Sequence, residues 1–135
     1  MSVFGVFHVS SSAMEAQRYR MNLIASNLAN QQTTKTEEGG PYKRQDVVFQ
    51  TTNLEDNSLY DGVKVAEIVQ DPGPPMLVYD PKHPDANDKG YVEMPNINTV
   101  EEMVNMMSSV RVYEANVSAF NISKAMFLKT LELGR

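Results

Sequence analysis

The stretch TVEEMVNMMSSVRVYEANVSAFNISKAMFLKTLEL, residues 99–133, predicts one long helix that sets the architecture of this chain. Two rows of mainly apolar side chains run along it at a spacing of seven residues. One row is Met103, Val110, Val117 and Leu131, and the other is Met106, Tyr113, Phe120 and Phe127. Together they form a heptad seam that only Lys124 interrupts, and a seam of this length needs a partner helix.

The ends of this helix carry recognisable signals. Thr99 followed by Glu102 matches a capping box, and Glu101 and Glu102 place negative charge at the positive end of the helix dipole. Lys129 lies near the other end, and Gly134 is a typical terminator. At 1.5 Å per residue, the helix would be about 52 Å long.

The other end of the chain offers the partner helix. A second heptad row consists of Phe7, Met14, Met21 and Leu28. This row favours a helix over about residues 4–30, although a capping box at Ser12 and Glu15 would also suit a start near Ala13. We therefore expect the two terminal helices to pair with each other.

Both predicted helices carry unusually few charges. Between Met103 and Ser123 the only charged residues are Arg111 and Glu114. An ordinary helical hairpin covers its outer face with Lys and Glu, whereas these helices carry Asn, Ser, Gln, Ala and Met. The pattern favours a hairpin that neighbouring molecules cover on several sides; the alternative is a soluble hairpin with a neutral surface.

On this interpretation, the apolar rows and several Asn residues lie at subunit interfaces. The predicted interface residues are Phe7, Met14, Met21, Asn22, Ile24, Asn27, Leu28, Asn30, Met103, Met106, Val110, Tyr113, Asn116, Val117, Phe120, Asn121, Phe127 and Leu131. Lys124 either extends its amine from the edge of the seam or faces a polar lumen.

The middle of the chain, residues 31–98, predicts a small β-rich module with Pro-rich loops. After a Thr- and Gly-rich break, strands are expected at 42–49, 62–69, 76–79 and 91–94, with a loop over 50–61 and a rigid connection over 71–75. The expected fold is mainly α with a small β-rich insert. We expect residues 1–30 and 99–135 to form a coiled-coil pair of helices and residues 31–98 to form the insert.

Composition narrows the range of functions. The 135 residues suit one domain, and without Cys there is no disulfide, thiol catalysis or Cys-based metal site. Residues 31–98 carry 12 acidic and 6 basic side chains, a net charge of −6, whereas the two ends are nearly neutral. An acidic chain argues against nucleic-acid binding. The sequence shows no membrane-spanning stretch and no conventional secretory signal.

The best candidate for chemistry is the segment Asp80-Pro-Lys-His-Pro-Asp85. His83 between two acids would suit a general base or a metal ligand. Two prolines around a single His are more typical of a surface turn, and His8 has no acid close in sequence. We therefore expect no enzyme activity, catalytic residue, cofactor or metal; a small hydrolase using His83 is the remote alternative.

Residues 12–30, SAMEAQRYRMNLIASNLAN, resemble the N-terminal signature of the bacterial flagellar axial family of rod, hook and hook-associated proteins. Other stretches resemble one proximal-rod member of that family: GGPYKR (39–44), VVF (47–49), DPGPP (71–75), LVYDP (77–81), HPD (83–85), GYV (90–92), residues 100–107, YEAN (113–116) and LELGR (131–135). The likeness covers roughly residues 4–49 and 68–135, and residues 50–67 match least.

The resemblance implies a structural subunit of the flagellar basal-body proximal rod, in the periplasm, exported unfolded by the type III apparatus without a cleaved signal. It implies an antiparallel coiled coil of the terminal helices, and these pairs stack into a helical tube, which transmits torque and surrounds the export channel. The C-terminal helix would face the channel, which makes Lys124 a candidate channel-lining residue. The implied partners are copies of the chain, proximal-rod paralogues, the distal rod protein, and the base ring and export apparatus, with no nucleic acid. A free helical-hairpin adaptor or export chaperone is the alternative function.

Overall fold

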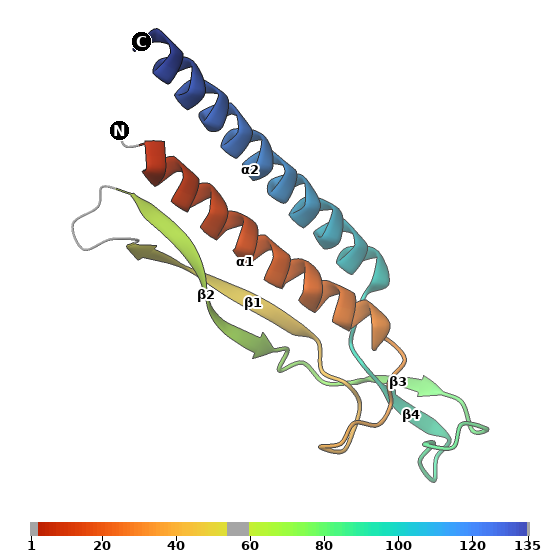
Figure 1. Ribbon diagram of the computed structural model, residues 1–135. Helices are drawn as coiled ribbons and strands as arrows, with labels where there is room; N and C mark the ends of the chain where they lie inside the picture. The colour runs from red at the N-terminus through yellow and green to blue at the C-terminus, as the bar shows by residue number, and fades with distance from the viewer. Residues whose placement is uncertain (1–2, 54–59, 135) are drawn as a thin grey trace.

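The computed structural model describes residues 3–53 and 60–134 (Figure 1). The elements, in chain order, are α1 (Val3–Ala29), β1 (Gln45–Asn53), β2 (Asp61–Gln70), β3 (Met76–Tyr79), β4 (Tyr91–Met94) and α2 (Thr99–Leu133). Two long helices with a small insert of antiparallel strands confirm the predicted class, mainly α with a β-rich insert. The division into domains 1–30 plus 99–135 and 31–98 stays a prediction.

Helix α1 is the middle layer of the molecule. In Figure 1 it lies between α2 on one side and the β1–β2 hairpin on the other, and α1 contacts all three elements. Near the start of α1, the ring of Phe7 lies 4.7 Å from that of Phe120, and near its end Asn27 bonds to Glu102. The chain therefore runs along α2 in the direction opposite to α1, and both termini lie at one end.

The insert consists of two separate two-stranded hairpins. The pairing of β1 with β2 runs from Gln45 opposite Gln70 to Asn53 opposite Asp61, with an irregularity between Val48 and Phe49. Strands β3 and β4 pair from Met76 opposite Met94 to Tyr79 opposite Tyr91, with the predicted bounds. The β3–β4 hairpin lies where α1 ends and α2 begins (Figure 1).

The first strand is displaced from its predicted position at residues 42–49. It begins at Gln45 and continues to Asn53, so residues 50–53 belong to a strand and not to the expected loop. These residues are polar, but Thr51 and Thr52 suit an extended backbone, and pairing with β2 extends the ladder. The rest of the expected loop, residues 54–59, lies outside the described residues.

The predicted capping box of α2 is wrong. The N-cap is Asn98, whose side-chain oxygen accepts hydrogen bonds from the backbone N–H groups of Val100 and Glu101. Thr99 instead donates to Gln31 Oε1 at 2.6 Å, and Glu102 is buried against other elements. Asn is as good a cap as Thr, so the predicted bounds of the helix are correct although its cap lies one residue earlier.

Helix α1 begins at Val3, which confirms the longer of the two expected helices. Ser12 therefore lies inside the helix and caps nothing. Its hydroxyl donates to the carbonyl of Val9 and accepts from the N–H of Val63, which fastens α1 to β2.

The seam between the helices uses only one of the two predicted rows of α2. Met106, Tyr113, Phe120 and Phe127 are half-buried, as expected. The second inward row is Glu102, Ser109, Asn116 and Ser123, not Met103, Val110, Val117 and Leu131. Of the latter four only Val117 is half-buried; the other three are 37–55% exposed. The hydrogen bond from Asn27 to Glu102 holds this polar row toward α1.

The apolar core is thin. Among the described residues, the buried apolar side chains are Ala16, Ile24, Val92 and Pro95, whereas Ser10, Asn27, Glu102 and Ser109 are buried and polar. Because buried polar groups are costly unless they are hydrogen-bonded, the contacts of these residues determine how the elements are held together.

Candidate assembly surfaces

Asn27 is the centre of a buried polar cluster that we call the joint, formed by Asn27, Tyr42, Arg44, Gln45 and Glu102. The Asn27 side chain is 0% exposed. Its Nδ2 donates to the Gln45 carbonyl at 2.8 Å and to Glu102 Oε2 at 3.0 Å. Its Oδ1 accepts from the Gln45 N–H at 3.0 Å and from the Tyr42 hydroxyl at 3.1 Å. Asn27 thus makes all four hydrogen bonds that an amide can make.

Glu102 adds an ion pair to the joint. Its side chain is 1% exposed, and its Oε1 accepts from Arg44 Nε at 2.6 Å. Arg44 also donates to Asp46 Oδ2 at 3.3 Å. Burial by itself would lower the pKa of Arg44, but the hydrogen bond and charge of Glu102, together with Asp46, outweigh it and raise that pKa. The guanidinium is therefore held in its charged form between two acids.

The end of α1 is closed by local hydrogen bonds beside the joint. Asn30 donates to the Ser26 carbonyl at 2.9 Å and accepts from the Thr33 hydroxyl at 3.1 Å. The Ser26 and Tyr42 hydroxyls lie 3.3 Å apart. The segment Asn27-Leu-Ala-Asn30 therefore ends one helix and also fixes its position against β1 and α2.

Sequence reasoning placed Asn27 at a subunit interface and Glu102 in a cap, and it gave Arg44 no role. Asn27 and Ile24 are buried within their own chain, so in this structure neither side chain can reach a neighbouring subunit. The available signal was weak: an Asn, an Arg and a Glu, each beside apolar residues and far apart in sequence. Only the fold brings them together.

The side of α2 that is turned away from α1 exposes apolar side chains, whereas the joint buries polar ones. We call this side the outer face of α2; along the part of α2 that packs on α1, its exposed apolar residues are Val100, Met103, Val104, Met107, Val110, Val112 and Ile122. Monomeric proteins rarely expose so many large apolar side chains on one element, and such patches typically mark association surfaces.

The other predicted interface residues fall into two groups. The exposed ones are Asn22, Met103, Val110, Asn121 and Leu131, and Lys124 is also exposed. The half-buried ones are Phe7, Met14, Met21, Leu28, Asn30, Met106, Tyr113, Asn116, Val117, Phe120 and Phe127. Asn116 donates to the carbonyl of Val112 in its own helix. The interface role of these residues stays a prediction.

The Asp80–Asp85 segment is a hydrogen-bonded turn. His83 Nδ1 accepts from the Asp85 N–H at 3.1 Å, and Asp80 Oδ1 accepts from the Lys82 N–H at 3.1 Å. Asp85 Oδ2 accepts from the Thr34 hydroxyl at 2.8 Å. The part of the chain that the structure describes contains no group of three or more His, Asp or Glu placed to hold a metal ion. The hydrogen bonds of these side chains stabilise the turn.

The described part of the chain also contains no helix with both the length and the hydropathy needed to cross a lipid bilayer. This includes α1 and α2, whose lengths of 27 and 35 residues would otherwise suffice.

Comparison with known proteins connects these surfaces to a family. Residues 7–34 match the family described as flagella basal body rod protein, and residues 88–133 match the C-terminal family of the flagellar basal body rod proteins FlgEFG. The two matches cover α1 from Phe7 onward and α2, together with the joint residues on both helices.

Several curated proteins match the chain over 98–100% of their length, and they are named flagellar basal-body rod protein FlgC. The flagellar basal-body rod protein FlgC of Escherichia coli O6:H1 is 46% identical over 135 residues, which is 100% of both chains. FlgC of Bacillus subtilis is 43% identical over 150 aligned residues, also 100% of both chains, and FlgC of Borreliella burgdorferi is 42% identical over 98% of both. The resemblance to a rod protein is confirmed: this chain belongs to the FlgC family of flagellar basal-body rod proteins and is a structural subunit of that rod.

Proposed function

We propose that the chain assembles through its terminal helices into a helical tube that transmits torque and surrounds the export channel. The observation that carries the proposal is the outer face of α2, whose apolar side chains include Met103, Val104 and Met107, each more than half exposed. A chain that leaves such a face uncovered gains stability when a neighbouring subunit covers it.

The type of assembly follows from the position of that face. We propose that a neighbouring molecule covers the outer face of α2 with a different surface of its own. Heterologous contacts of this kind generate rings if the rotation closes and open helical filaments if it does not. A rod subunit needs contacts that generate an open helical filament.

Within each subunit we propose that α1 and α2 act as an antiparallel coiled coil. The ring contact of Phe7 with Phe120 and the bond of Asn27 to Glu102 support this pairing, because they join opposite ends of the two helices. Its seam is unusual, since one of its two rows on α2 is small and polar.

The polar side chains of the second half of α2 support a lumen on this helix. Asn121 and Lys124 are both exposed, and Lys124 interrupts an otherwise apolar row. We propose that Lys124 lines the export channel, where water solvates its amine. The rod would then lie in the periplasm, assemble from chains exported unfolded, and contact paralogous rod proteins, the base ring and the export apparatus.

A free helical-hairpin adaptor or export chaperone is the competing function. The relatives are named as basal-body rod proteins, which does not favour it. The two differ in location, because washed basal bodies contain a rod subunit and lack a cytoplasmic adaptor. The same relatives speak against an enzyme that uses His83.

Replacing Met103 tests the proposal. Met103→Glu places a charge on the outer face without disturbing the seam, since Met103 is 53% exposed. We expect the variant monomer to unfold like the unmodified chain but to be lost from washed basal bodies, with swimming abolished. The control Met103→Leu keeps the site apolar and is expected to assemble. Normal incorporation and motility of Met103→Glu would refute the role of this face.

A second substitution tests the neutral positions. Asn121→Glu lies on the exposed side, whereas Asn116→Glu also places charge in the half-buried row facing α1. We expect both to block assembly, and only Asn116→Glu to destabilise the monomer as well. Normal motility with either variant would contradict the expectation that neighbouring subunits cover both positions.

A further inference from the structure

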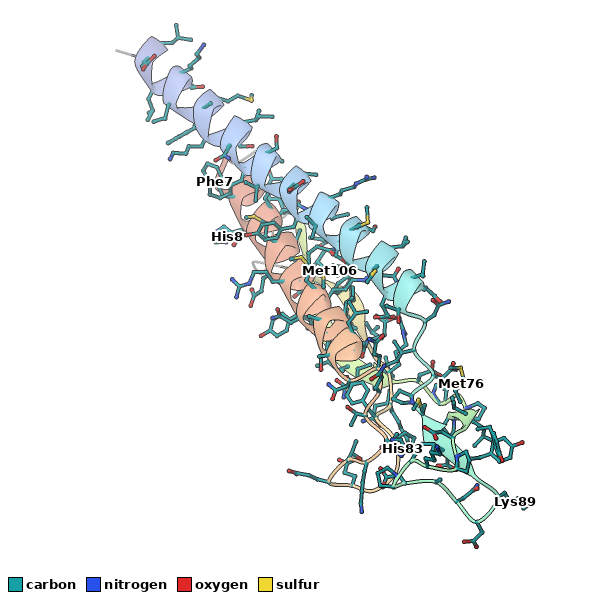
Figure 2. The ribbon with its side chains drawn as sticks, turned by 90° about the vertical axis from the view of Figure 1, so that its right-hand side faces the viewer. Phe7, His8, Met76, His83, Lys89 and Met106 are labelled. Carbon is teal, nitrogen blue, oxygen red and sulfur yellow. The ribbon has the colours of Figure 1, made fainter. Side chains whose placement is uncertain are left out.

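Helix α2 carries two overlapping heptad seams that have one row in common. The shared row consists of Met106, Tyr113, Phe120 and Phe127. The polar seam, which faces α1 in the structure, combines this row with Glu102, Ser109, Asn116 and Ser123. The apolar seam would combine it with Met103, Val110 and Val117. In Figure 2, Phe7 and Met106 lie where the two helices run side by side, so the shared row is in contact with α1.

The two seams differ by a small rotation of α2 about its own axis. Successive residues of a helix lie about 100° apart, and the centre of each seam lies midway between its two rows. Exchanging the polar row for the apolar row therefore takes a rotation of roughly 50°, during which the shared row stays toward α1. The hydrogen bond from Thr99 to Gln31 belongs to the shared row, because Thr99 lies seven residues before Met106.

The buried polar row of α2 forms hydrogen bonds mainly within its own helix. The side chains of Ser109, Asn116 and Ser123 each donate, at 2.9 Å, to the backbone carbonyl four residues earlier. These bonds turn with α2 and do not oppose a change of seam. The polar seam meanwhile leaves Met103 and Val110 53% and 37% exposed, whereas burying apolar side chains is favourable.

The polar seam also contains an unsatisfied group of α1. Gln17 lies ten residues from both Phe7 and Asn27, which contact α2 near the two ends of α1. This spacing places Gln17 between them, on the side of α1 that faces α2. Within the described residues, its Oε1 is buried and has no hydrogen-bond partner. Such an oxygen disfavours the arrangement that buries it, so other contacts must hold the polar seam in place.

Glu102 makes those contacts. In the described structure it is the one residue of the polar row that bonds to other elements, through Oε2 to Asn27 on α1 and through Oε1 to Arg44 just before β1. Because an α-helix is stiff, fixing the first turn of α2 determines which row faces α1 along the pair. The two bonds exist only in the polar seam, since the rotation carries the carboxylate away from both partners, and they therefore select that state.

We propose that the joint is a rotational lock. It holds α2 in the polar seam, and without it α2 turns by roughly 50° into the apolar seam and buries Met103 and Val110 against α1. The consequence rests on the proposed function, because both side chains belong to the outer face of α2 that a neighbouring subunit covers. A locked chain presents this face, whereas an unlocked chain covers part of it with its own α1. The joint thus controls assembly through side chains that it does not contact.

Thiol labelling of the purified full-length chain tests the rotation, because the protein contains no Cys. Three single-Cys variants report one row each: Ser109→Cys the polar row, Val110→Cys the apolar row and Met106→Cys the shared row. The rate of reaction with a maleimide is measured for each variant, with the joint intact and with the joint broken.

Glu102→Lys breaks the joint, since it removes the acceptor for Asn27 and places a second cation beside Arg44. Glu101→Lys is the matched control, because it makes the same charge change in the same helix turn at an exposed position. Each of these substitutions is combined with each of the three Cys variants.

With the joint intact or with Glu101→Lys, Val110→Cys should react at least about tenfold faster than Ser109→Cys, because Ser109 is 1% exposed. With Glu102→Lys the order should reverse, since the apolar row becomes buried and the polar row exposed. The rate for Met106→Cys should change by less than about threefold, because the shared row faces α1 in both states. Glu102→Lys should also be lost from washed basal bodies.

An unchanged order with Glu102→Lys would show that packing alone fixes the rotation, which overturns the proposal. Fast labelling of all three thiols would show that the joint holds α2 against α1 and does not choose its rotation, which also overturns it. A reversed order with full incorporation of Glu102→Lys would overturn the control of assembly. These results leave the proposed tube standing, whereas absence of the unmodified protein from washed basal bodies would refute the proposed function and leave the labelling result unaffected.

Discussion

The two ends of the helix pair differ in burial and in the kind of side chain that they carry. At the joint, Asn27 and Glu102 are almost fully buried, and their polar atoms bond to residues of the same chain. In the part of α2 that extends beyond α1, residues 125–133, which we call the overhang, Leu131 and Leu133 are exposed and no described residue of the same chain covers them. The chain thus fixes its own fold with specific polar bonds and leaves apolar side chains exposed at the far end of α2.

The comparison is tested most severely at Asn27. Asn27→Asp removes the donor that bonds the Gln45 carbonyl and Glu102, and it places a second carboxylate beside a buried one. We expect the free energy of unfolding to fall by about 4 kcal/mol, measured by urea denaturation of the purified chain. The control, Asn22→Asp at an exposed position of α1, should change it by less than about 0.5 kcal/mol. Equal losses would mean that the joint is not special.

Glu102→Gln comes next in expected size. It leaves Arg44 with Asp46 as its remaining acidic partner and should cost about 2–3 kcal/mol by the same measurement. Glu101→Gln is the matched control, because it removes the same charge from the same helix turn at an exposed site. A similar loss of stability in both variants would mean that the carboxylates act through the helix dipole and that the ion pair with Arg44 adds nothing.

The ion pair of Arg44 and Glu102 should stabilise the chain by the same amount throughout the mildly alkaline range. The pKa of Arg44 is raised, so the stability from its charge is complete below the unfolded-state pKa and is lost only as pH rises through the folded value, both well above pH 10. The difference between Glu102→Gln and the unmodified chain should therefore stay constant from pH 8 to 10. A difference that shrinks over this range would show that another group carries the effect.

Along the seam the expected effect is smaller. Phe120→Ala removes the ring that contacts Phe7 and should lower the free energy of unfolding by about 2 kcal/mol, because the side chain is only half-buried. Ile122→Ala, two residues on and 58% exposed, should cost less than about 0.5 kcal/mol. Reversed magnitudes would mean that the inward row of α2 is assigned wrongly.

The smallest effect on the monomer is expected at the overhang. Leu131→Ser should change the free energy of unfolding by less than about 0.5 kcal/mol, since Leu131 is 55% exposed and lies beyond α1. Phe127→Ser, four residues earlier and half-buried, should cost more. Calorimetry of the two purified variants tests this, and a larger loss for Leu131→Ser would place the overhang within the folded core of the monomer.

Local periodicity was sufficient to predict the elements. The apolar rows of residues 99–133 gave α2 its bounds, and the short runs Met76–Tyr79 and Tyr91–Met94 gave β3 and β4. It was not sufficient for the strand over residues 50–53, because their extension depends on pairing with β2 and not on their own hydrophobicity.

The sites were harder to predict than the elements. A heptad pattern shows that α2 has apolar rows but not which of them turns toward α1. The row of Glu102 and Ser109 faces α1 because the hydrogen bonds of Glu102 in the joint fix the rotation of α2 about its axis. That rotation is set by Asn27 and Arg44, which lie 75 and 58 residues away in sequence.

Placing α1 as the middle layer has a consequence for the order in which the fold is completed. A chain that emerges N-terminus first presents α1 before either of its covers. The β1–β2 hairpin is the first cover available, and Ser12 can then bond to Val63. The other side waits for α2, so Asn27 cannot make its bond to Glu102 until about three quarters of the chain has emerged. The first helix made is thus among the last parts of the molecule to be finished, which keeps an incomplete chain loose until its final helix arrives.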